Sequence, residues 1–318
     1  MNEPHPSSAL FARKPGEKRF VVIDGNHLIH RAFYAIQAPL KTSSGEQTNA
    51  LYGFASMLLN ILELEKPDYI ALTFDERAPT FRHEAHEAYK ATRVKAPDEL
   101  YAQIPRIREM VKAFKIPIFA KEGFEADDML GTLAEKAKEH GWTTYIITGD
   151  MDAFQLIGGN TYVVVPHKGY KEPILFDDKA VKEKYGVSAD QIVDYKALVG
   201  DTSDNMKGVE GIGPKRATEL LGRYKTLDGI YGHLDEIPES VRKKLESGKE
   251  AAYFCQMMAR IVRDVPCDFH KHEAAFHDLD FLGFGRFLER MEMTSLLRRL
   301  KKITPENKAV SEGQMSLF

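Results

Sequence analysis

The sequence predicts an α/β fold, in which a central sheet carries helices on both faces, followed by a smaller helical domain. Three short apolar runs look like buried strands, and helical patterns lie between them. After about residue 190 the pattern changes to helices and glycine-rich turns. The length of 318 residues also favours about two domains. We expect a flexible N-terminal tail at 1–17, an α/β core at 18–190, a helical domain at 191–300 and a flexible tail at 301–318.

The predicted strands are rich in β-branched or aromatic residues and span residues 20–23, 69–74 and 144–148. Helical patterns between them include 51–64 and 104–114. Acidic residues follow each strand: Asp24 and Asp75 come directly after the first two strands, and Asp150 and Asp152 come after Gly149, which follows the third. Ligands of open α/β sheets bind beyond the carboxyl ends of the strands. We therefore expect these acids to meet at one edge of the sheet.

Composition excludes two classes of protein. With 43% hydrophobic and 29% charged residues, the chain is too apolar to be disordered over most of its length. No apolar run approaches the ~20 residues that cross a bilayer, which excludes a membrane protein. The first residues lack the apolar segment of a signal peptide, and the chain has two cysteines. We therefore expect a cytoplasmic protein without a disulfide framework or a structural zinc site.

Two further acidic groups lie away from the strand ends. Glu125, Asp127 and Asp128 open a predicted helix, where an acidic first turn is ordinary. Asp201 and Asp204 are spaced i, i+3 and can face one side, although a simple turn has the same pattern. Each group alone is therefore compatible with capping.

Taken together, nine acids predict a metal centre. Two-metal hydrolysis of phosphodiesters needs several anionic oxygens around cations roughly 3.5 to 4 Å apart. Oxygen ligands suit Mg²⁺ or Mn²⁺, and these motifs contain no histidine or cysteine for zinc. Clustered carboxylates repel one another, so such a site needs bound cations, and scattered surface acids are the alternative. The predicted ligands of two or more ions are Asp24, Asp75, Glu125, Asp127, Asp128, Asp150, Asp152, Asp201 and Asp204.

A basic segment follows Asp75 and contains Arg82, Tyr89, Lys90 and Arg93. Lys90 and Arg93 are spaced i, i+3 and share a face if the segment is helical. Cations beside an acidic metal site can hold a phosphate that is cut, and an aromatic ring can stack on an unpaired base. A solvated amphipathic helix is the alternative. The position directly after a strand-end acid favours the functional interpretation.

The segment GVEGIGPKRA, at residues 208–217, is typical of a helix-hairpin-helix. Gly208, Gly211 and Gly213 allow a tight turn whose backbone N–H groups approach a phosphate, and Lys215 lies in the first turn of the next helix. Such contacts fix the register of a duplex without reading its bases. A structural turn between helices is the alternative. The segment begins four residues after Asp204, which predicts duplex beside the metals.

Several stretches resemble one known family, the 5′ nuclease domain of bacterial DNA polymerase I and the related flap endonucleases. They run in family order from about residue 20 to 266 and read VVIDGNHLIHRAF, TNALYGF, FDERAPTFRHE, YKATR, EGFEADDMLGTLA, TGDMDAFQL, ALVGDTSDNMKGVEGIGPKRA and RIVRDVP. The resemblance implies a PIN-like core with a helical arch at about 77–98, followed by a DNA-binding domain. It places the family's metal-binding acids on the nine carboxylates above.

The same resemblance implies further roles and an activity. Lys90 and Arg93 match the basic pair of the arch and, with Asp75, are the implied catalytic residues. The hairpin at 208–217 matches a duplex-binding motif that often holds a potassium ion. The implied activity is magnesium-dependent cleavage of branched DNA near the single-strand/double-strand junction, trimming 5′ flaps and RNA primers of Okazaki fragments. Three residues depart from the family pattern, His27, Met151 and Lys207, and none removes a carboxylate.

The last five residues resemble the peptide by which bacterial replication proteins dock on the sliding clamp. Leu317 and Phe318 form an apolar pair and Gln314 supplies hydrogen bonds, at the end of a polar tail. A tail without function is the alternative, and the terminal location favours docking. We also expect a complete, standalone chain that acts as a monomer on bacterial DNA in the nucleoid.

Two other functions remain open at this point. A PIN-type ribonuclease shares the strand-end acids and metals but lacks the arch and hairpin. A non-catalytic, structure-specific DNA-binding scaffold predicts flap binding without magnesium-dependent cleavage.

Overall fold

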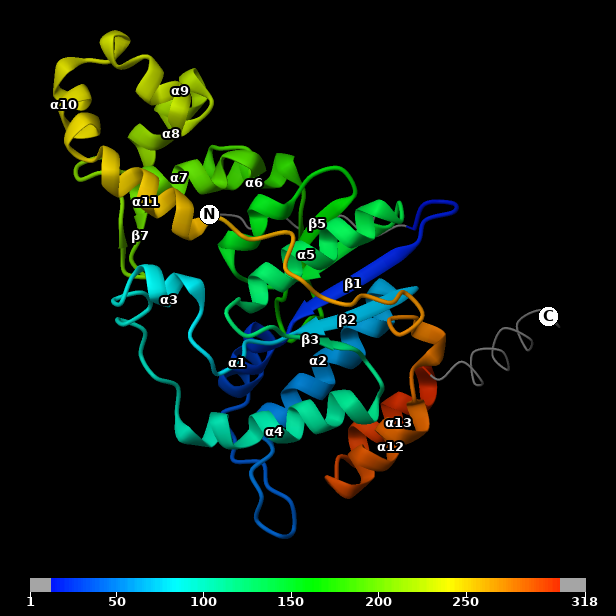
Figure 1. Cartoon of the computed structure of the whole chain (residues 1–318). Coiled ribbons are helices and arrows are strands. Elements are labelled where there is room, and N and C mark those ends of the chain that lie inside the picture. Colours follow the sequence, from blue (N-terminus) through cyan, green and yellow to red (C-terminus); the bar gives the residue numbers. More distant parts are fainter. Residues whose placement is uncertain (1–12, 304–318) are drawn as a thin grey trace.

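The computed structural model describes residues 13–303, and its centre is a six-stranded sheet (Figure 1). The strand order is β3-β2-β1-β4-β5-β6. The first five strands of this order are parallel, and β6 is antiparallel to β5. The strands are β1 Arg19–Asp24, β2 Tyr69–Thr73, β3 Ile118–Phe119, β4 Thr143–Ile147, β5 Thr161–Val165 and β6 Ile174–Phe176.

Helices cover both faces of the sheet because successive strand residues point to opposite sides. Phe20 and Val22 of β1 belong to one apolar cluster, and Val21 and Ile23 belong to the other. The first cluster includes α5 Ala126–Glu139, η1 Met151–Leu156 and α6 Asp178–Tyr185. The second includes α1 Gly25–Ala35, α2 Asn49–Glu65 and α4 Asp98–Ala113. The predicted α/β core is confirmed.

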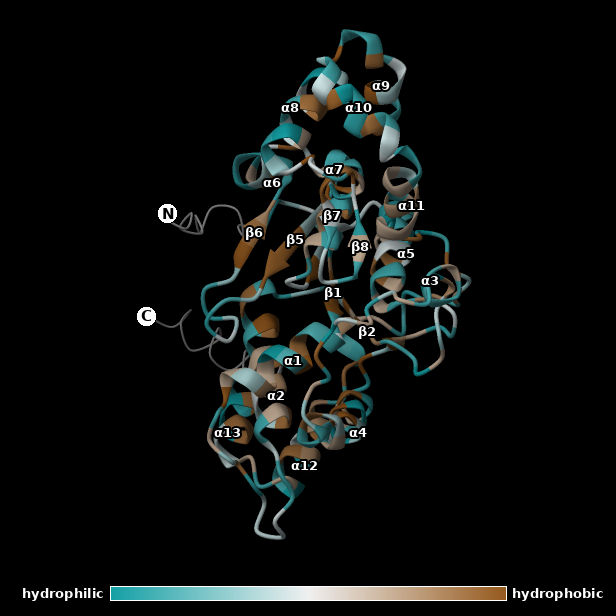
Figure 2. Cartoon of the chain, turned by 90° about the vertical axis from the view of Figure 1, so that its left-hand side faces the viewer, coloured by the Kyte–Doolittle hydropathy of each residue, from teal (hydrophilic) through white to brown (hydrophobic). Residues whose placement is uncertain are grey.

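The chain after residue 190 is mainly helical, as predicted. A short hairpin of two strands interrupts the helices, and the α8–α10 region projects from one end of the molecule (Figure 2). The elements are η2 Ala189–Gln191, α7 Ile192–Val199, β7 Gly200–Asp201, β8 Met206–Lys207, α8 Pro214–Tyr224, α9 Leu227–Gly232, η3 Leu234–Glu236, α10 Glu239–Ser247, α11 Lys249–Ala259 and η4 Phe276–Asp278.

The last two helices differ from the expected domain at 191–300. Helices α12 Phe281–Arg290 and α13 Thr294–Ile303 pack against α4 and α2, at the opposite end from α8–α10 (Figures 1 and 2). Phe284 of α12 stacks on Phe114 with ring centroids 4.4 Å apart. Burial of this apolar face therefore places residues 281–303 with the helices that cover one face of the sheet rather than with the projecting helices.

The predicted helical arch at 77–98 is mostly not helical. It contains one short helix, α3 Phe81–Ala85, and then turns. Lys90 adopts a left-handed backbone conformation with φ of 58°, so it does not share a helical face with Arg93. The prediction of a helical pair was wrong: the Lys90 amide donates to the Asp204 carbonyl at 3.1 Å instead of to a helical turn, and the Lys90 and Arg93 side chains contact acids that are described below.

The described residues include a part of each predicted tail. Residues 13–17 are part of the fold, because Arg13 forms an ion pair with Asp68 and the Lys14 amide donates to Glu17 at 2.7 Å. Helix α13 likewise extends to Ile303, into the predicted C-terminal tail.

Across residues 13–303, none of the helices has the length and apolar character needed to cross a bilayer. Gln314, Leu317 and Phe318 lie outside the described residues.

Candidate active site

Three acids project from neighbouring strand ends. Asp24 ends β1 and caps α1, accepting a hydrogen bond from the His27 amide at 2.9 Å. Ile23 of β1 lies in register with Leu72 of β2 and Ile147 of β4. The parallel strands therefore end at one edge of the sheet, and the segments that carry Asp75 and Asp150 leave from the same edge.

The N-terminus of α5 adds two more acids to this edge. Glu125 caps the helix, and the Ala126 amide donates to the Asp75 carboxylate at 2.7 Å, which holds α5 against the strand ends. A cavity of about 800 Å³ lies here. Seven of the nine predicted metal ligands line it, namely Asp24, Asp75, Glu125, Asp127, Asp150, Asp152 and Asp204.

A second group of acids adjoins this cavity. One carboxylate oxygen from each of Asp152, Asp201 and Asp204 lies within 4.8 Å of the others. Asp201 lines a neighbouring cavity of about 390 Å³, which shares Asp150 with the first. The structure therefore brings eight of the nine predicted acids to two adjoining cavities.

The protonation equilibria of these acids indicate a need for cations. Burial raises the pKa of Asp24 to about 7, against hydrogen bonds from the His27 amide and the Thr148 hydroxyl. Burial and the neighbouring Asp150 and Asp24 carboxylates raise the pKa of Asp127 well above its usual value. Divalent cations would favour the ionised forms and are well matched by carboxylate oxygens. The residues present therefore fit a divalent metal centre.

Side-chain cations already balance part of this negative charge. The Lys90 ammonium contacts Glu125 at 2.6 Å, and the Arg93 guanidinium contacts Asp204 at 2.5 Å. The basic pair of the arch segment therefore lies at the site, as predicted, although through turns rather than a helix. Both residues line the larger cavity.

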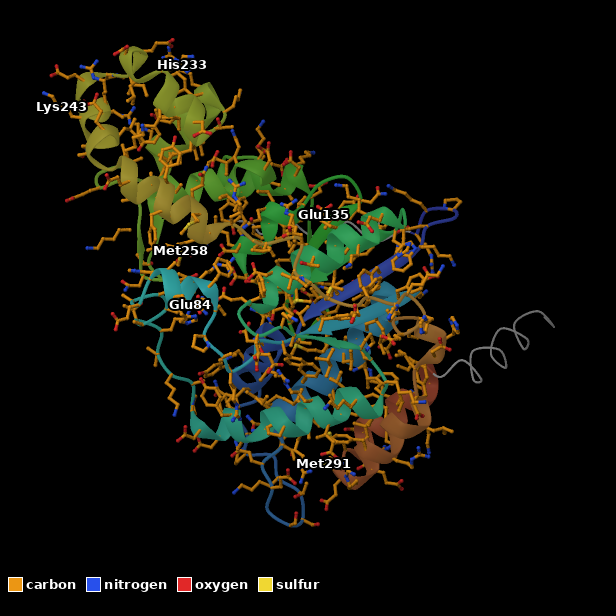
Figure 3. The ribbon with its side chains drawn as sticks, in the orientation of Figure 1. Glu84, Glu135, His233, Lys243, Met258 and Met291 are labelled. Carbon is orange, nitrogen blue, oxygen red and sulfur yellow. The ribbon has the colours of Figure 1, made fainter. Side chains whose placement is uncertain are left out.

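Asp128 and Arg82 differ from their predicted roles as metal ligand and DNA contact. Asp128 is fully buried and accepts hydrogen bonds from the Arg82 guanidinium at 2.7 and 2.9 Å. The amides of Glu125 and Val262 also donate to it, at 3.0 and 2.8 Å. Arg82 is 2% exposed and donates to the Met258 carbonyl at 2.8 Å. The buried pair thus joins α3 to α5 and to the end of α11. Figure 3 labels Glu84 on α3 and Met258 at the end of α11.

Tyr89 also differs from its prediction as a base-stacking residue. Tyr89 is 4% exposed, and its hydroxyl oxygen lies 3.1 Å from a carboxylate oxygen of both Glu125 and Asp204, so that its single proton can be donated to either acid. Burial and the nearby carboxylates raise its pKa, so it acts as a neutral donor that fixes the two acids.

Sequence reasoning missed Lys196 of α7. This lysine is 7% exposed, contacts Asp201 at 2.6 Å and also pairs with Asp152. The available signal was a lysine between Tyr195 and Ala197, in a stretch of residues 192–199 whose only other charged residue is Asp194. His27, noted as a departure, lines both cavities; burial lowers its pKa to about 4, and its buried Nε2 has no partner among the described residues.

The hairpin glycines have three different environments. A Cβ on Gly208 would lie 2.3 Å from the Gly200 nitrogen, and Gly211 has a φ of 78°. Gly213 caps α8, and a Cβ there would meet no atom within 4 Å. Lys215 is exposed on the first turn of α8. At Gly213 the turn therefore leaves open space beside the backbone, and Lys215 places a cation at the same helix N-terminus; duplex binding at this turn stays a prediction.

Family models cover most of the chain. A model described as the N-terminal resolvase-like domain of 5′-3′ exonuclease matches residues 19–186, and one described as its C-terminal SAM fold matches residues 187–281. The chain belongs to the 5′-3′ exonuclease family. The family resemblance inferred from the motifs is confirmed.

Relatives of this chain include DNA polymerase I of Caldicellulosiruptor bescii, which is 43% identical over 284 residues, with 89% of the chain and 33% of the polymerase covered. DNA polymerase I of Bacillus caldotenax is 39% identical over 289 residues, with 88% and 33% covered. The chain therefore spans about one third of the length of these relatives.

Solved structures share the fold. A zinc-bound T5 5′-exonuclease has a TM-score of 0.64 at 18% identity, with 90% of this chain and 98% of that chain covered. Human GEN1 in complex with Holliday junction DNA has a TM-score of 0.58 at 17% identity, with 89% and 72% covered. At these identities the likeness shows the fold, which agrees with the predicted nuclease core and helical domain.

Proposed function

We propose that this member of the 5′-3′ exonuclease family is a structure-specific 5′ nuclease that cuts DNA at single-strand/double-strand junctions. The main support is the cavity of about 800 Å³, where seven carboxylates face Lys90 and Arg93. Acids for cations and cations for phosphate thus occupy one site. The family membership favours this function over a PIN-type ribonuclease.

The metals in this proposal are Mg²⁺ or Mn²⁺, held by the acids that line the two cavities. Bound divalent ions would supply an activated water and neutralise charge on the phosphate. Lys90 and Arg93 are proposed to hold the phosphate once they leave Glu125 and Asp204. The water attacks phosphorus and the P–O3′ bond breaks, so the products carry a 5′-phosphate and a 3′-hydroxyl.

The duplex is proposed to lie on the hairpin at residues 208–217. The open backbone around Gly213 and the exposed Lys215 support this placement. A potassium ion is also proposed at this turn. The Lys244 ammonium could take the place of this ion, because it donates a hydrogen bond to the Gly211 carbonyl at 3.3 Å.

The cellular role is proposed to be removal of 5′ flaps and RNA primers. Docking on a sliding clamp through Gln314, Leu317 and Phe318 is part of this proposal, as are a monomeric state and a location at the nucleoid. Removing residues 314–318 should spare basal cleavage and abolish stimulation by the clamp. Stimulation that survives this truncation would exclude the docking role.

Cleavage of a labelled 5′-flap duplex tests the function, with a blunt duplex and single-stranded RNA as comparison substrates and with Mg²⁺ or EDTA. We expect flap cleavage with Mg²⁺ only. Asp75→Asn should lower the cleavage rate by at least about 100-fold while flap affinity stays near the wild-type value. Flap binding without cleavage in the wild type would instead support a scaffold, and RNA cleavage alone would support a ribonuclease.

A further inference from the structure

A buried ammonium lies between two of the candidate metal ligands. The Lys196 side chain is 9% exposed, contacts Asp201 at 2.6 Å and also pairs with Asp152. Asp152 and Asp201, together with Asp204, offer oxygens within 4.8 Å of one another. Two of the three carboxylates that could bind one cation, Asp152 and Asp201, are therefore already paired with the Lys196 ammonium.

The surroundings of Lys196 favour its charged form. Burial lowers its pKa, but the Asp152 and Asp201 carboxylates outweigh burial and raise it above the usual value. The pKa of Asp201 is lowered, because the Lys196 ammonium and hydrogen bonds from Ser203 outweigh the effect of burial. The ion pairs thus compensate charges that would otherwise be buried without partners.

Lys196 is more buried than the two arch cations and comes from a packed helix. The Lys90 and Arg93 side chains are 21% and 48% exposed and come from a segment of turns. Lys196 comes from α7, whose neighbours Ala197 and Leu198 are fully buried. Its backbone is fixed by packing, and the Cys255 thiol lies 3.2 Å from its carbonyl oxygen. Only its side chain can leave the carboxylates.

We propose that Lys196 is an internal competitor for the cation position formed by Asp152, Asp201 and Asp204. A divalent ion enters this position only when the Lys196 ammonium leaves the carboxylates, since both use the same oxygens. The inference rests on the proposed metal-dependent function. It implies that the two cavities fill in order, with the position beside Lys196 filled at the higher metal concentration.

Binding of Mn²⁺ to the full chain without DNA tests this inference. Electron paramagnetic resonance counts free Mn²⁺ during a titration at pH 8, above the pKa of about 6 to which burial raises Asp152. The variants are Lys196→Met, which removes the charge, and Lys196→Gln, which keeps a hydrogen-bond donor. The control is Lys243→Met, because Lys243 is 70% exposed on α10, far from the site (Figure 3).

We expect two classes of Mn²⁺ site in the wild type. Both Lys196 variants remove a unit positive charge a few ångströms from the Asp152 and Asp201 carboxylates. The dissociation constant of the weaker Mn²⁺ site should therefore fall by about tenfold or more in both variants. The Lys243 control should match the wild type. Circular dichroism checks folding, and the glutamine variant decides the question if the methionine variant does not fold.

The contrary outcomes are distinct. The role of Lys196 would be overturned if the wild type binds Mn²⁺ at two sites and the dissociation constant of the weaker site is unchanged or larger in the folded variants. The proposed metal centre would remain in that case. A wild-type chain that binds no Mn²⁺ would overturn the metal centre and this inference together. A lysine that only contacts DNA predicts the first of these results.

Discussion

Neutralising Asp128 should destabilise the fold rather than remove a metal ligand. Its carboxylate is fully buried and accepts two hydrogen bonds from Arg82, which is itself 2% exposed. In Asp128→Asn the amide group would face the guanidinium donors, and the buried positive charge would lose its main partner. Breaking a buried ion pair of this kind costs about 3 to 5 kcal/mol.

Thermal unfolding in EDTA measures this cost. For a chain of this size, about 1 kcal/mol lowers the Tm by roughly 2 °C, so we expect a decrease of about 6 to 10 °C for Asp128→Asn. The neighbouring Asp127→Asn is the matched control. Burial and the charges of Asp150 and Asp24 raise the pKa of Asp127, so its neutralisation should keep or raise the Tm in EDTA while weakening Mn²⁺ binding. A wild-type Tm for Asp128→Asn, together with lost Mn²⁺ binding, would refute this reasoning.

Three further outcomes follow from the site and the hairpin. The pKa of Asp24 is raised to about 7, so between about pH 4 and 7 the native state holds a proton that the unfolded state has lost. The free energy of unfolding in EDTA should therefore decrease as the pH rises from about 4 to 7, and the decrease should be smaller in Mg²⁺. Thermal unfolding across this pH range measures both effects. Lys215→Ala should reduce duplex affinity alike for all sequences and lower the salt slope by about 1 in a binding titration, whereas Lys179→Ala on α6, 83% exposed, should not. Gly208→Ala should lower the Tm by several degrees, because its Cβ would lie 2.3 Å from a backbone nitrogen, while Gly213→Ala should not.

The strand-end acids could be predicted from the sequence because their placement depends on local rules. Strands β1, β2 and β4 are short and apolar, and each has an acid at its end or shortly after it: Asp24 is the last residue of β1, Asp75 follows β2 after one residue, and Asp150 follows β4 after two. Parallel strands in register bring such residues to one edge of the sheet. The sequence therefore indicated both the sheet and the position of the acidic cavity.

Contacts between distant segments could not be predicted in this way. Asp127 and Asp128 are adjacent, but successive helix residues point about 100° apart, and only Asp127 faces the cavity. The sequence did not show which of the two acids would turn inward, because the partner of Asp128 is Arg82, 46 residues away. Tyr89 and Lys196 were misjudged or missed for the same reason, since their roles arise from carboxylates that the fold brings to them.

Anomalous diffraction from crystals grown with Mn²⁺ tests the central claim most directly. We expect Mn²⁺ in the cavity lined by Asp24, Asp75 and Asp127 at low metal concentration, and a further ion beside Asp152 and Asp201 at higher concentration. No anomalous density in either cavity at saturating Mn²⁺ would contradict the claim that these carboxylates form the metal centre of a nuclease.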